Sequence, residues 1–332
     1  MKNRIYLLIA FTGLIFAGCD KETHPSPSDD LGIVERFSPG EDAAPEVKAM
    51  YNDYGVWVRT HFNSVAELTN SILATDQIVA MYGAENLETE KVPEVLNYSQ
   101  RLLENVSKEY ARKFFPLEFY YVKQYGGAYW IYPIRALGRS RLIIMWPNTE
   151  DGVLPVTDAV NHYYQDSVLS AKIWNALGGM ITARMEEPLT DFIAAGKAYD
   201  EGAAYEKLGD EYDKDEAAYF KEHPDEKDEE DENIINQRPY VIKYNNAVKE
   251  LCRNGGYLSG SGSRSFENDF ADWLRVLATE SYDNIKANYL DNSKPRAMKY
   301  NIIVKYFSQY NWDIQAAGNL YRQKFDGYKA AE

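Results

Sequence analysis

The sequence changes character at Leu117-Glu118-Phe119-Tyr120-Tyr121-Val122, where aromatic and β-branched side chains replace a helical pattern. This composition is typical of a β-strand. Gly126-Gly127 then indicates a turn, and residues 128–134 indicate a second strand. Leu142-Ile143-Ile144-Met145-Trp146 is short and apolar throughout, as expected of a third strand. The sequence therefore predicts a small sheet within residues 117–146.

Helical periodicity lies on both sides of this block. Upstream, apolar residues recur at three- and four-residue spacing over 65–83 and 93–114. Downstream, the pattern predicts six more helices, over residues 156–180, 188–202, 239–253, 266–290, 296–308 and 312–327. We expect an α+β fold that is mostly helical, with the small sheet packed on the helix that bears His162.

An acidic insert interrupts the helical pattern at about 205–237. Its centre is the run Asp225-Glu226-Lys227-Asp228-Glu229-Glu230-Asp231-Glu232. Carboxylates can gather calcium, but this run lacks the alternating-oxygen spacing and the glycine of a calcium loop. The simpler interpretation is a solvated loop.

The N-terminus has the pattern of an export signal. Lys2 and Arg4 precede an apolar stretch from Ile5 to Phe16, which is too short to remain as a membrane-spanning helix. Phe16-Ala17-Gly18-Cys19 resembles a bacterial lipobox, in which the cysteine is lipidated; the alternative is an ordinary signal peptide with an incidental cysteine. We predict a signal peptide at 1–18, a lipidated flexible tether at 19–44, and one domain at 45–332.

The composition limits which kinds of partner we expect for the exported chain. Asp20-Lys21-Glu22 resembles the surface-export signal of some lipoproteins, so we expect a lipid anchor in the outer membrane, facing outward. Loss of Lys2 and Arg4 lowers the formal net charge from −15 to −17, which argues against nucleic-acid binding. Cys252 is the only other cysteine, so no intrachain disulfide is expected in the mature chain.

Three further segments, in this order, carry a family resemblance. The first is Asp158-Ala159-Val160-Asn161-His162-Tyr163-Tyr164-Gln165, which is similar to an H-E-x-x-H helix followed by aromatic residues and glutamine. The second runs from Gly256-Tyr257-Leu258-Ser259 to Glu267-Asn268-Asp269-Phe270-Ala271-Asp272, and the third lies in 299–314. They resemble the substrate import-associated zinc metallohydrolase lipoproteins, which accompany TonB-dependent nutrient importers.

The resemblance implies a zincin-like or gluzincin-like metallopeptidase fold. In an active member, two histidines four residues apart bind zinc, and the glutamate between them takes a proton from the metal-bound water. A glutamate from the later helix completes the ligands, and a tyrosine upstream of that helix stabilises the oxyanion.

In this chain the positions that would carry the chemistry differ. The first histidine position is Asp158, the general-base position is Ala159, and the second histidine is retained as His162. The third-ligand position is Asn268 and the tyrosine position is Ser261. We expect no intact catalytic group, and any zinc held by Asp158, His162 and Asn268 would be weakly bound.

The histidine count supports this expectation without any alignment. The four histidines are His24, His61, His162 and His223, and no two are four residues apart. Glu267 or Asp269 offers a carboxylate, but neighbouring helical positions point about 100° away from residue 268. Asp158 with His162 remains a candidate for another metal with waters, although a lone histidine is more often structural.

The leading functional hypothesis is a pseudoenzyme that binds a peptide or glycan without cutting it. Its cleft would be lined by Tyr163, Tyr164 and Tyr257, although abundant tyrosine is equally typical of core edges. The expected partner is a TonB-dependent transporter with its surface lipoprotein. The alternatives are an active zinc-dependent metallohydrolase with a non-standard ligand set and a structural accessory subunit of the importer.

Overall fold

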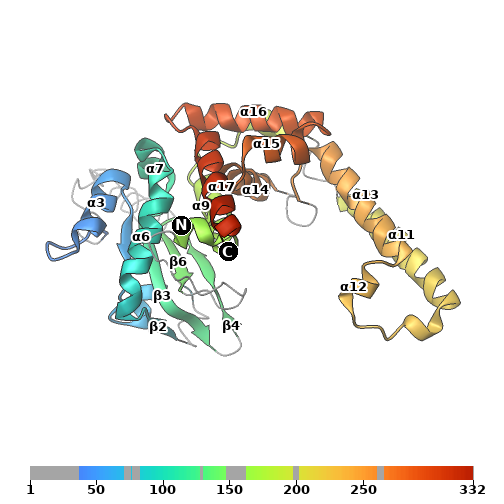
Figure 1. Cartoon of the computed structure of the whole chain (residues 1–332), viewed down its shortest axis with the longest axis horizontal. Helices are drawn as coiled ribbons and strands as arrows, with labels where there is room; N and C mark the ends of the chain where they lie inside the picture. The colour runs from blue at the N-terminus through green and yellow to red at the C-terminus, as the bar shows by residue number, and fades with distance from the viewer. Residues whose placement is uncertain are drawn as a thin grey trace, which may run out of the picture. The chain divides into compact units, whose positions relative to one another are not determined.

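The computed structural model describes residues 37–70, 76, 83–127, 130–146, 162–196, 202–259 and 265–331. The chain divides into two compact units, Met1–Ser38 and Pro39–Glu332, and the elements described below belong to the second. This unit begins before the predicted domain boundary at residue 45. The predicted signal peptide and Cys19 lie outside the described residues. The fold is α+β, mostly helical with a small mixed sheet, as predicted (Figure 1).

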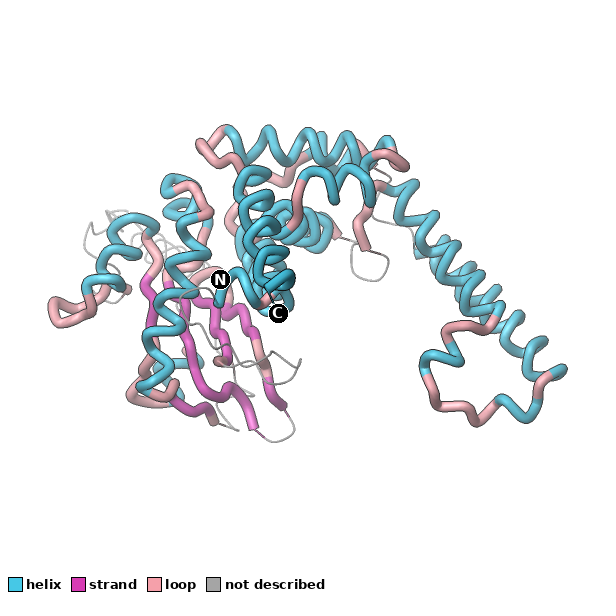
Figure 2. Tube along the Cα trace, viewed as in Figure 1, coloured by secondary structure: helices cyan, strands magenta, loops and turns pink. Residues whose placement is uncertain are grey.

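The sheet has the strand order β1-β3-β6-β5. Figure 2 shows its strands in magenta. These strands are β1 (Trp57–Arg59), β3 (Glu118–Gly127), β6 (Arg141–Met145) and β5 (Ile134–Leu137). The first three are parallel, whereas β5 runs antiparallel to β6. Two short strands, β2 (Ala84–Asn86) and β4 (Trp130–Ile131), also pair with β3. Among the described strands, β5 therefore forms an edge of the sheet.

The strands predicted at 117–122 and 142–146 are confirmed, whereas the middle of the block differs. The predicted strand at 128–134 is divided between β4 and β5. Gly126 and Gly127 do not form the turn, because they pair with Ile131 and Trp130 at the end of β3. Side chains alternate along the strands, so one face of the sheet packs into the main hydrophobic core and the other face packs into a smaller hydrophobic cluster.

A buried ionic cluster joins the beginnings of β3 and β6 to the end of β1. Glu118 accepts from Arg141 at 2.6 Å and from Arg59 at 2.9 Å, and its side chain is fully buried. Arg141 also donates to the carbonyl oxygens of Glu67 and Leu68. These carbonyls lie at the end of a short helix, so the cluster ties that helix to the sheet.

The helices before and beside the sheet are α3 (Pro45–Tyr54), α4 (Val65–Thr69), α6 (Val92–Glu104), α7 (Lys108–Phe114), α8 (His162–Gln165), α9 (Ser167–Thr182) and α10 (Thr190–Ala194). The later ones are α11 (Gly202–Glu222), α12 (Glu232–Ile235), α13 (Pro239–Gly255), α14 (Phe266–Thr279), α15 (Tyr282–Ile285), α16 (Lys294–Ser308) and α17 (Ile314–Ala331). Single turns of 3-10 helix occur at Thr89–Lys91 and Pro224–Glu226, and a π-helical turn occurs at Lys286–Leu290.

Capping residues divide several predicted helices. Asp166 separates α8 from α9, because its side chain accepts a hydrogen bond from the Leu169 N–H at 2.7 Å. Ser107 caps α7 within the predicted helix 93–114, and Ser281 caps α15 within the predicted helix 266–290. Periodicity alone missed these breaks, because apolar spacing continues across them.

The acidic insert is mostly helical outside its acidic run, and this helical structure was not predicted from the sequence; the run at 225–232 itself consists mainly of turns and loop, as predicted. Its 21-residue helix α11 lies beside α13 (Figure 2). Tyr205 is the buried residue of α11, so the apolar periodicity that predicts helices is weak there. The run at 225–232 is largely exposed, as expected of solvated charge.

Helices α9 and α14 pack closely at a glycine. A Cβ atom on Gly178 would lie 2.5 Å from the Ala271 Cα atom and 2.6 Å from its Cβ atom. No real side chain tolerates such contacts, so Gly178 allows the two backbones to approach. This contact fixes the register between α9 and α14.

A neighbouring pair of glycines tests this packing. Gly178→Ala should lower the free energy of unfolding by about 1–3 kcal/mol through overpacking. Gly179→Ala is the matched control, because a Cβ atom there meets nothing within 4 Å and alanine favours a helix by roughly 0.5–1 kcal/mol. Urea unfolding measures both. Equal effects of the two substitutions would contradict the proposed contact.

Candidate functional site

Several predicted site residues lie outside the described part of the chain: Asp158, Ala159 and Ser261. The backbone of His162 begins α8, and its side chain is outside the description. Asn268, Tyr163, Tyr164 and Tyr257 are described. Their positions test whether the predicted groups come together.

The register of α9 and α14 places His162 and Asn268 at opposite ends of this helix pair. Gly178 lies against Ala271, and the Asn175 amide donates to Asp272 Oδ1 at 3.4 Å. Residue numbers on the two helices therefore run in opposite directions, and Asn268 lies level with the end of α9. His162 precedes the start of α9.

The length of α9 separates the two ends of this helix pair. Helix α9, Ser167–Thr182, has 16 residues and spans about 24 Å at 1.5 Å per residue. Ligands of one zinc ion lie about 2 Å from it. Asp158 and the side chain of His162 lie outside the described residues, so the metal set predicted from sequence, Asp158 with His162 and Asn268, stays a prediction. The sequence match assigned the histidine-bearing turn correctly to a helix but gave no information on how α14 packs.

The carboxylates beside Asn268 do not replace it. Asp269 is fully buried and forms an ion pair with Lys299 Nζ at 2.6 Å. Burial lowers the pKa of Lys299, and the attraction of Asp269 opposes that shift. Glu267 and Asn268 are exposed on the first turn of α14, where the Asn268 N–H donates to Ser265 Oγ. The Asp269 carboxylate is therefore already paired with Lys299 inside the protein.

The three tyrosines predicted to line a cleft are buried instead, which corrects that expectation. Tyr163 is fully enclosed, and its ring lies 5.3 Å from that of Tyr98 and 5.2 Å from that of Tyr321. Burial raises the pKa of Tyr163 well above its usual value. Tyr164 and Tyr257 are also buried. These rings serve packing between helices rather than an open surface.

The other two described histidines, His61 and His223, do not belong to a group of possible metal ligands. His61 is exposed, and His223 stacks on Tyr219 in the acidic insert. Within the described ranges, no group of three or more histidine, cysteine, aspartate or glutamate side chains is placed to hold a metal ion. The same ranges contain no helix with the length and apolar character needed to cross a membrane.

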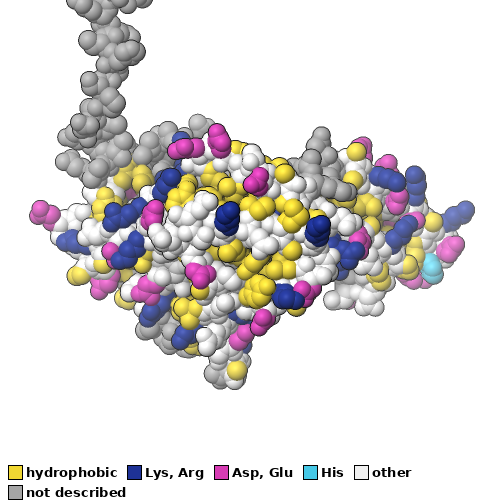
Figure 3. Space-filling model, turned by 90° about the horizontal axis from the view of Figure 1, so that it is seen from above, with side chains coloured by type: hydrophobic (Ala, Val, Ile, Leu, Met, Phe, Trp, Pro, Cys, Tyr) yellow, Lys and Arg dark blue, Asp and Glu magenta, His cyan; other side chains and the backbone are white. Residues whose placement is uncertain are grey.

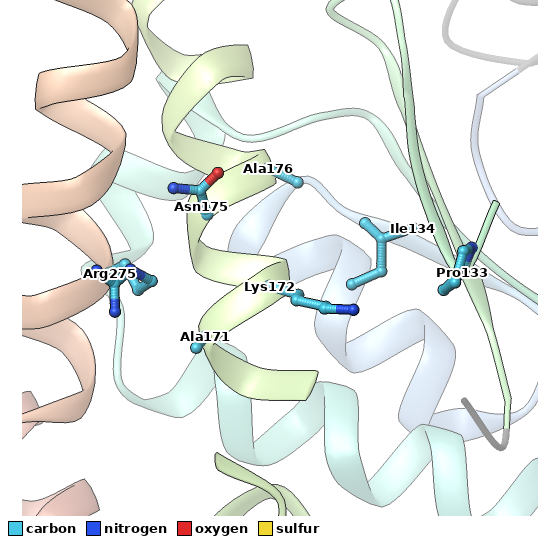
Figure 4. A pocket seen from close by; sticks show the side chains of 7 residues that line it. All are labelled: Pro133, Ile134, Ala171, Lys172, Asn175, Ala176 and Arg275. Atoms are coloured by element: carbon cyan, nitrogen blue, oxygen red, sulfur yellow. The ribbon is translucent and has the colours of Figure 1, made fainter. Parts of the chain in front are cut away.

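The structure instead presents a pocket of about 500 Å³ between β5, α9 and α14 (Figure 4). Pro133 and Ile134 form its side at the sheet edge, and Arg275 comes from α14. The remaining lining residues belong to α9: Ala171, Lys172, Asn175 and Ala176. Lys172 extends from α9 toward Pro133 and Ile134 in this view.

One helix supplies most of the described lining of the pocket. Ala171, Lys172 and Asn175 occupy relative positions 1, 2 and 5 of one helix, which is the spacing of an H-E-x-x-H motif. A later helix contributes Arg275, and an antiparallel edge strand completes the wall. None of the described side chains that line the pocket is an imidazole, carboxylate or thiolate, so these side chains do not fit a zinc ion.

A polar network lies beside this pocket. Asp272 Oδ2 accepts from Ser259 Oγ at 2.7 Å, and Asp272 Oδ1 accepts from the Asn175 amide. The guanidinium of Arg275 lies 3.8 Å from Asp272 Oδ1, too far for a strong hydrogen bond. The network orients Asn175 while the guanidinium retains donors for another group.

Sequence reasoning missed this pocket because it searched for histidines. The signal present in the sequence was the strand at residues 134–137. A helix that packs against such an edge strand, as α9 does, can form a pocket with it. Comparison with protein-family models, curated proteins and solved structures finds no match to this chain. The assignment of function therefore rests on the residues themselves.

The buried ion pair gives a direct test of the α14 environment. Asp269→Asn should lower the free energy of unfolding by about 3–5 kcal/mol, because it leaves the Lys299 ammonium buried without its counter-charge. Glu267→Gln is the matched control on the exposed face and should change stability by less than about 0.5 kcal/mol. Thermal and urea unfolding measure both. A small effect of Asp269→Asn would show that its carboxylate is available for other roles.

Proposed function

We propose that this chain is a lipid-anchored outer-membrane protein with a zincin-like metallopeptidase fold that binds peptide without hydrolysing it. The export signal, the lipobox at Cys19 and the family resemblance support the location and the association with a TonB-dependent importer. The pocket between β5, α9 and α14 is the proposed binding site.

One observation carries the proposal: the helix face that meets the sheet edge bears Ala171, Lys172 and Asn175, opposed by Arg275. Metal-assisted hydrolysis needs neutral imidazoles and a proton acceptor at such a site. A lysine ammonium has three donors and no acceptor, and an arginine guanidinium remains protonated. These groups can hold a ligand, but they cannot activate water as a general base.

The edge strand favours peptide over glycan as the ligand. Pro133 O accepts from the Met145 N–H at 2.8 Å, so residues 133 and 135 face β6. In an antiparallel pair this alternation turns the backbone groups of Ile134 and Ala136 away from β6. An extended peptide can add to such an edge through main-chain hydrogen bonds.

The proposal predicts neither metal binding nor turnover. Mature full-length protein, stripped with chelator, reloaded with zinc and desalted, should retain far less than one zinc ion per chain by elemental analysis. Incubation with casein should release no more peptides than heat-inactivated protein, with or without added zinc. Mass spectrometry of the released peptides provides the measurement.

The opposite result identifies the alternative function. One retained zinc ion per chain, together with casein cleavage that chelator abolishes, would establish a zinc hydrolase with a non-standard ligand set. A pull-down that recovers a TonB-dependent transporter, from cells in which no peptide binding is measurable, would favour a structural accessory subunit.

A further inference from the structure

We propose that a second pocket, at the ends of α7, α9 and α16, binds a free apolar α-amino acid in its zwitterionic form. This pocket has a volume of about 160 Å³. It shares no described lining residue with the pocket beside β5. The site is therefore separate from the proposed peptide binding, and it adds a second class of ligand.

Four charged side chains line this second pocket, and they carry two charges of each sign. The basic ones are Lys113 and Arg184, and the acidic ones are Glu186 and Glu187. None of the four belongs to an ion pair within the described part of the chain. Both kinds of charge are thus present around one pocket without neutralising each other. A small molecule that carries an ammonium and a carboxylate can pair with both kinds at once.

Arg184 is the group that would bind the carboxylate. Its side chain is partly buried, and one N–H donates to the Phe115 carbonyl oxygen just after α7. Burial and the neighbouring Arg139 guanidinium both lower the pKa of Arg184. A guanidinium has five N–H donors in a planar fork, so it retains donors that fit a carboxylate. A buried charge without a counter-charge is costly, and a bound carboxylate reduces that cost.

Lys113 adds positive charge on the α7 side of the pocket. Its ammonium lies 5.3 Å from the ring centroids of both Phe114 and Tyr310. The end of a helix also favours a cation, and Lys113 lies in the last turn of α7. These contacts position the ammonium but bring no carboxylate to it. The charge of Lys113 therefore adds to the attraction for a ligand carboxylate.

Glu186 and Glu187 supply the opposite charge for the ligand ammonium. Both are exposed and follow the end of α9, in the same short segment as Arg184. The two charges of an α-amino acid flank a single carbon atom, so groups from one short segment can contact both. Basic and acidic side chains are interspersed on the face shown in Figure 3. The general surface charge therefore does not select this ligand, and the selection is local.

The rest of the described lining suits an apolar side chain. It consists of Phe114, Met185, Tyr306 and Tyr310. The Tyr306 ring lies 5.6 Å from that of Tyr310 and 6.5 Å from that of Phe114, so the three rings form one wall. A volume of about 160 Å³ lies below the roughly 300 Å³ at which sites for drug-sized ligands begin. One amino acid therefore suits the pocket better than a peptide or a glycan.

Leucine and two analogues test the requirement for both charges. Isothermal titration of the full mature protein should show binding of leucine. Leucinamide lacks the carboxylate, and N-acetyl-leucine lacks the ammonium. Each analogue should bind at least about fivefold more weakly than leucine, as expected when a charge-assisted hydrogen bond is lost.

Substitution of Arg184 assigns the carboxylate to this residue. Arg184→Gln should weaken leucine binding by at least about fivefold but leave leucinamide binding no weaker, since leucinamide has no carboxylate to lose. Arg139→Gln is the matched control, because Arg139 is exposed, donates to the Ala183 carbonyl oxygen and is absent from the described lining. It carries the same charge change and should alter leucine binding less than twofold.

Substitution of the glutamates assigns the ammonium. The double variant Glu186→Gln with Glu187→Gln should weaken leucine binding by at least about fivefold and leave N-acetyl-leucine binding no weaker. Glu229→Gln with Glu230→Gln, in the acidic run, is the control with the same charge change. Urea unfolding shows whether each variant folds. The glutamates are exposed, so their variant tests the site even where Arg184→Gln is unstable.

The outcomes separate this inference from the proposed function. Equal affinity for leucine and both analogues would overturn the zwitterion site, and so would a lack of leucine binding up to its solubility limit. Equal effects of Arg184→Gln and Arg139→Gln would show that the carboxylate does not contact Arg184. Peptide binding beside β5 uses other residues and would stand under each of these results.

Discussion

The contact between Gly178 and Ala271 sets the register on which the site depends. Because α9 and α14 run antiparallel through this point, residues 171–176 face the same region as residue 275. The same register carries Asn268 away from His162. A side chain at position 178 would push the helices apart and open this arrangement. The chemistry of the pocket therefore follows from one close approach of two backbones.

Charge placement distinguishes the two ends of α14. Near its start, Asp269 and Lys299 neutralise each other in the interior, with the Lys299 ammonium 4.4 Å from the Tyr257 ring centroid. This pair secures α14 and α16 but leaves no carboxylate for a ligand. Further along the helix, Asp272 is held by Ser259 while Arg275 remains accessible. The accessible charged group that α14 contributes to the described lining of the pocket is therefore the Arg275 guanidinium.

Local patterns predicted the elements better than their arrangement. The strands around Tyr120 and Ile143 were predictable, because aromatic and β-branched residues form runs there. Helix α11 was missed because it buries almost no apolar side chain. Asp166 has the side chain of a helix cap, but apolar spacing across it concealed the break. Tyr163 was assigned to a cleft because it follows His162, whereas the packing of α17 encloses its ring.

Designed zinc ligands test most directly whether residue 275 of α14 opposes the face of α9 that bears residues 171 and 175. Two histidines at positions i and i+4 of a helix can bind zinc by themselves. The double variant Ala171→His with Asn175→His is therefore the reference against which a third ligand is measured. Lys207→His with Glu211→His on α11 controls for an isolated pair. Adding Arg275→Glu to the reference should tighten zinc binding by at least about tenfold, because a third ligand then completes the site. Equal zinc affinity with and without the glutamate would contradict the account, since residue 275 would not oppose the face that bears residues 171 and 175.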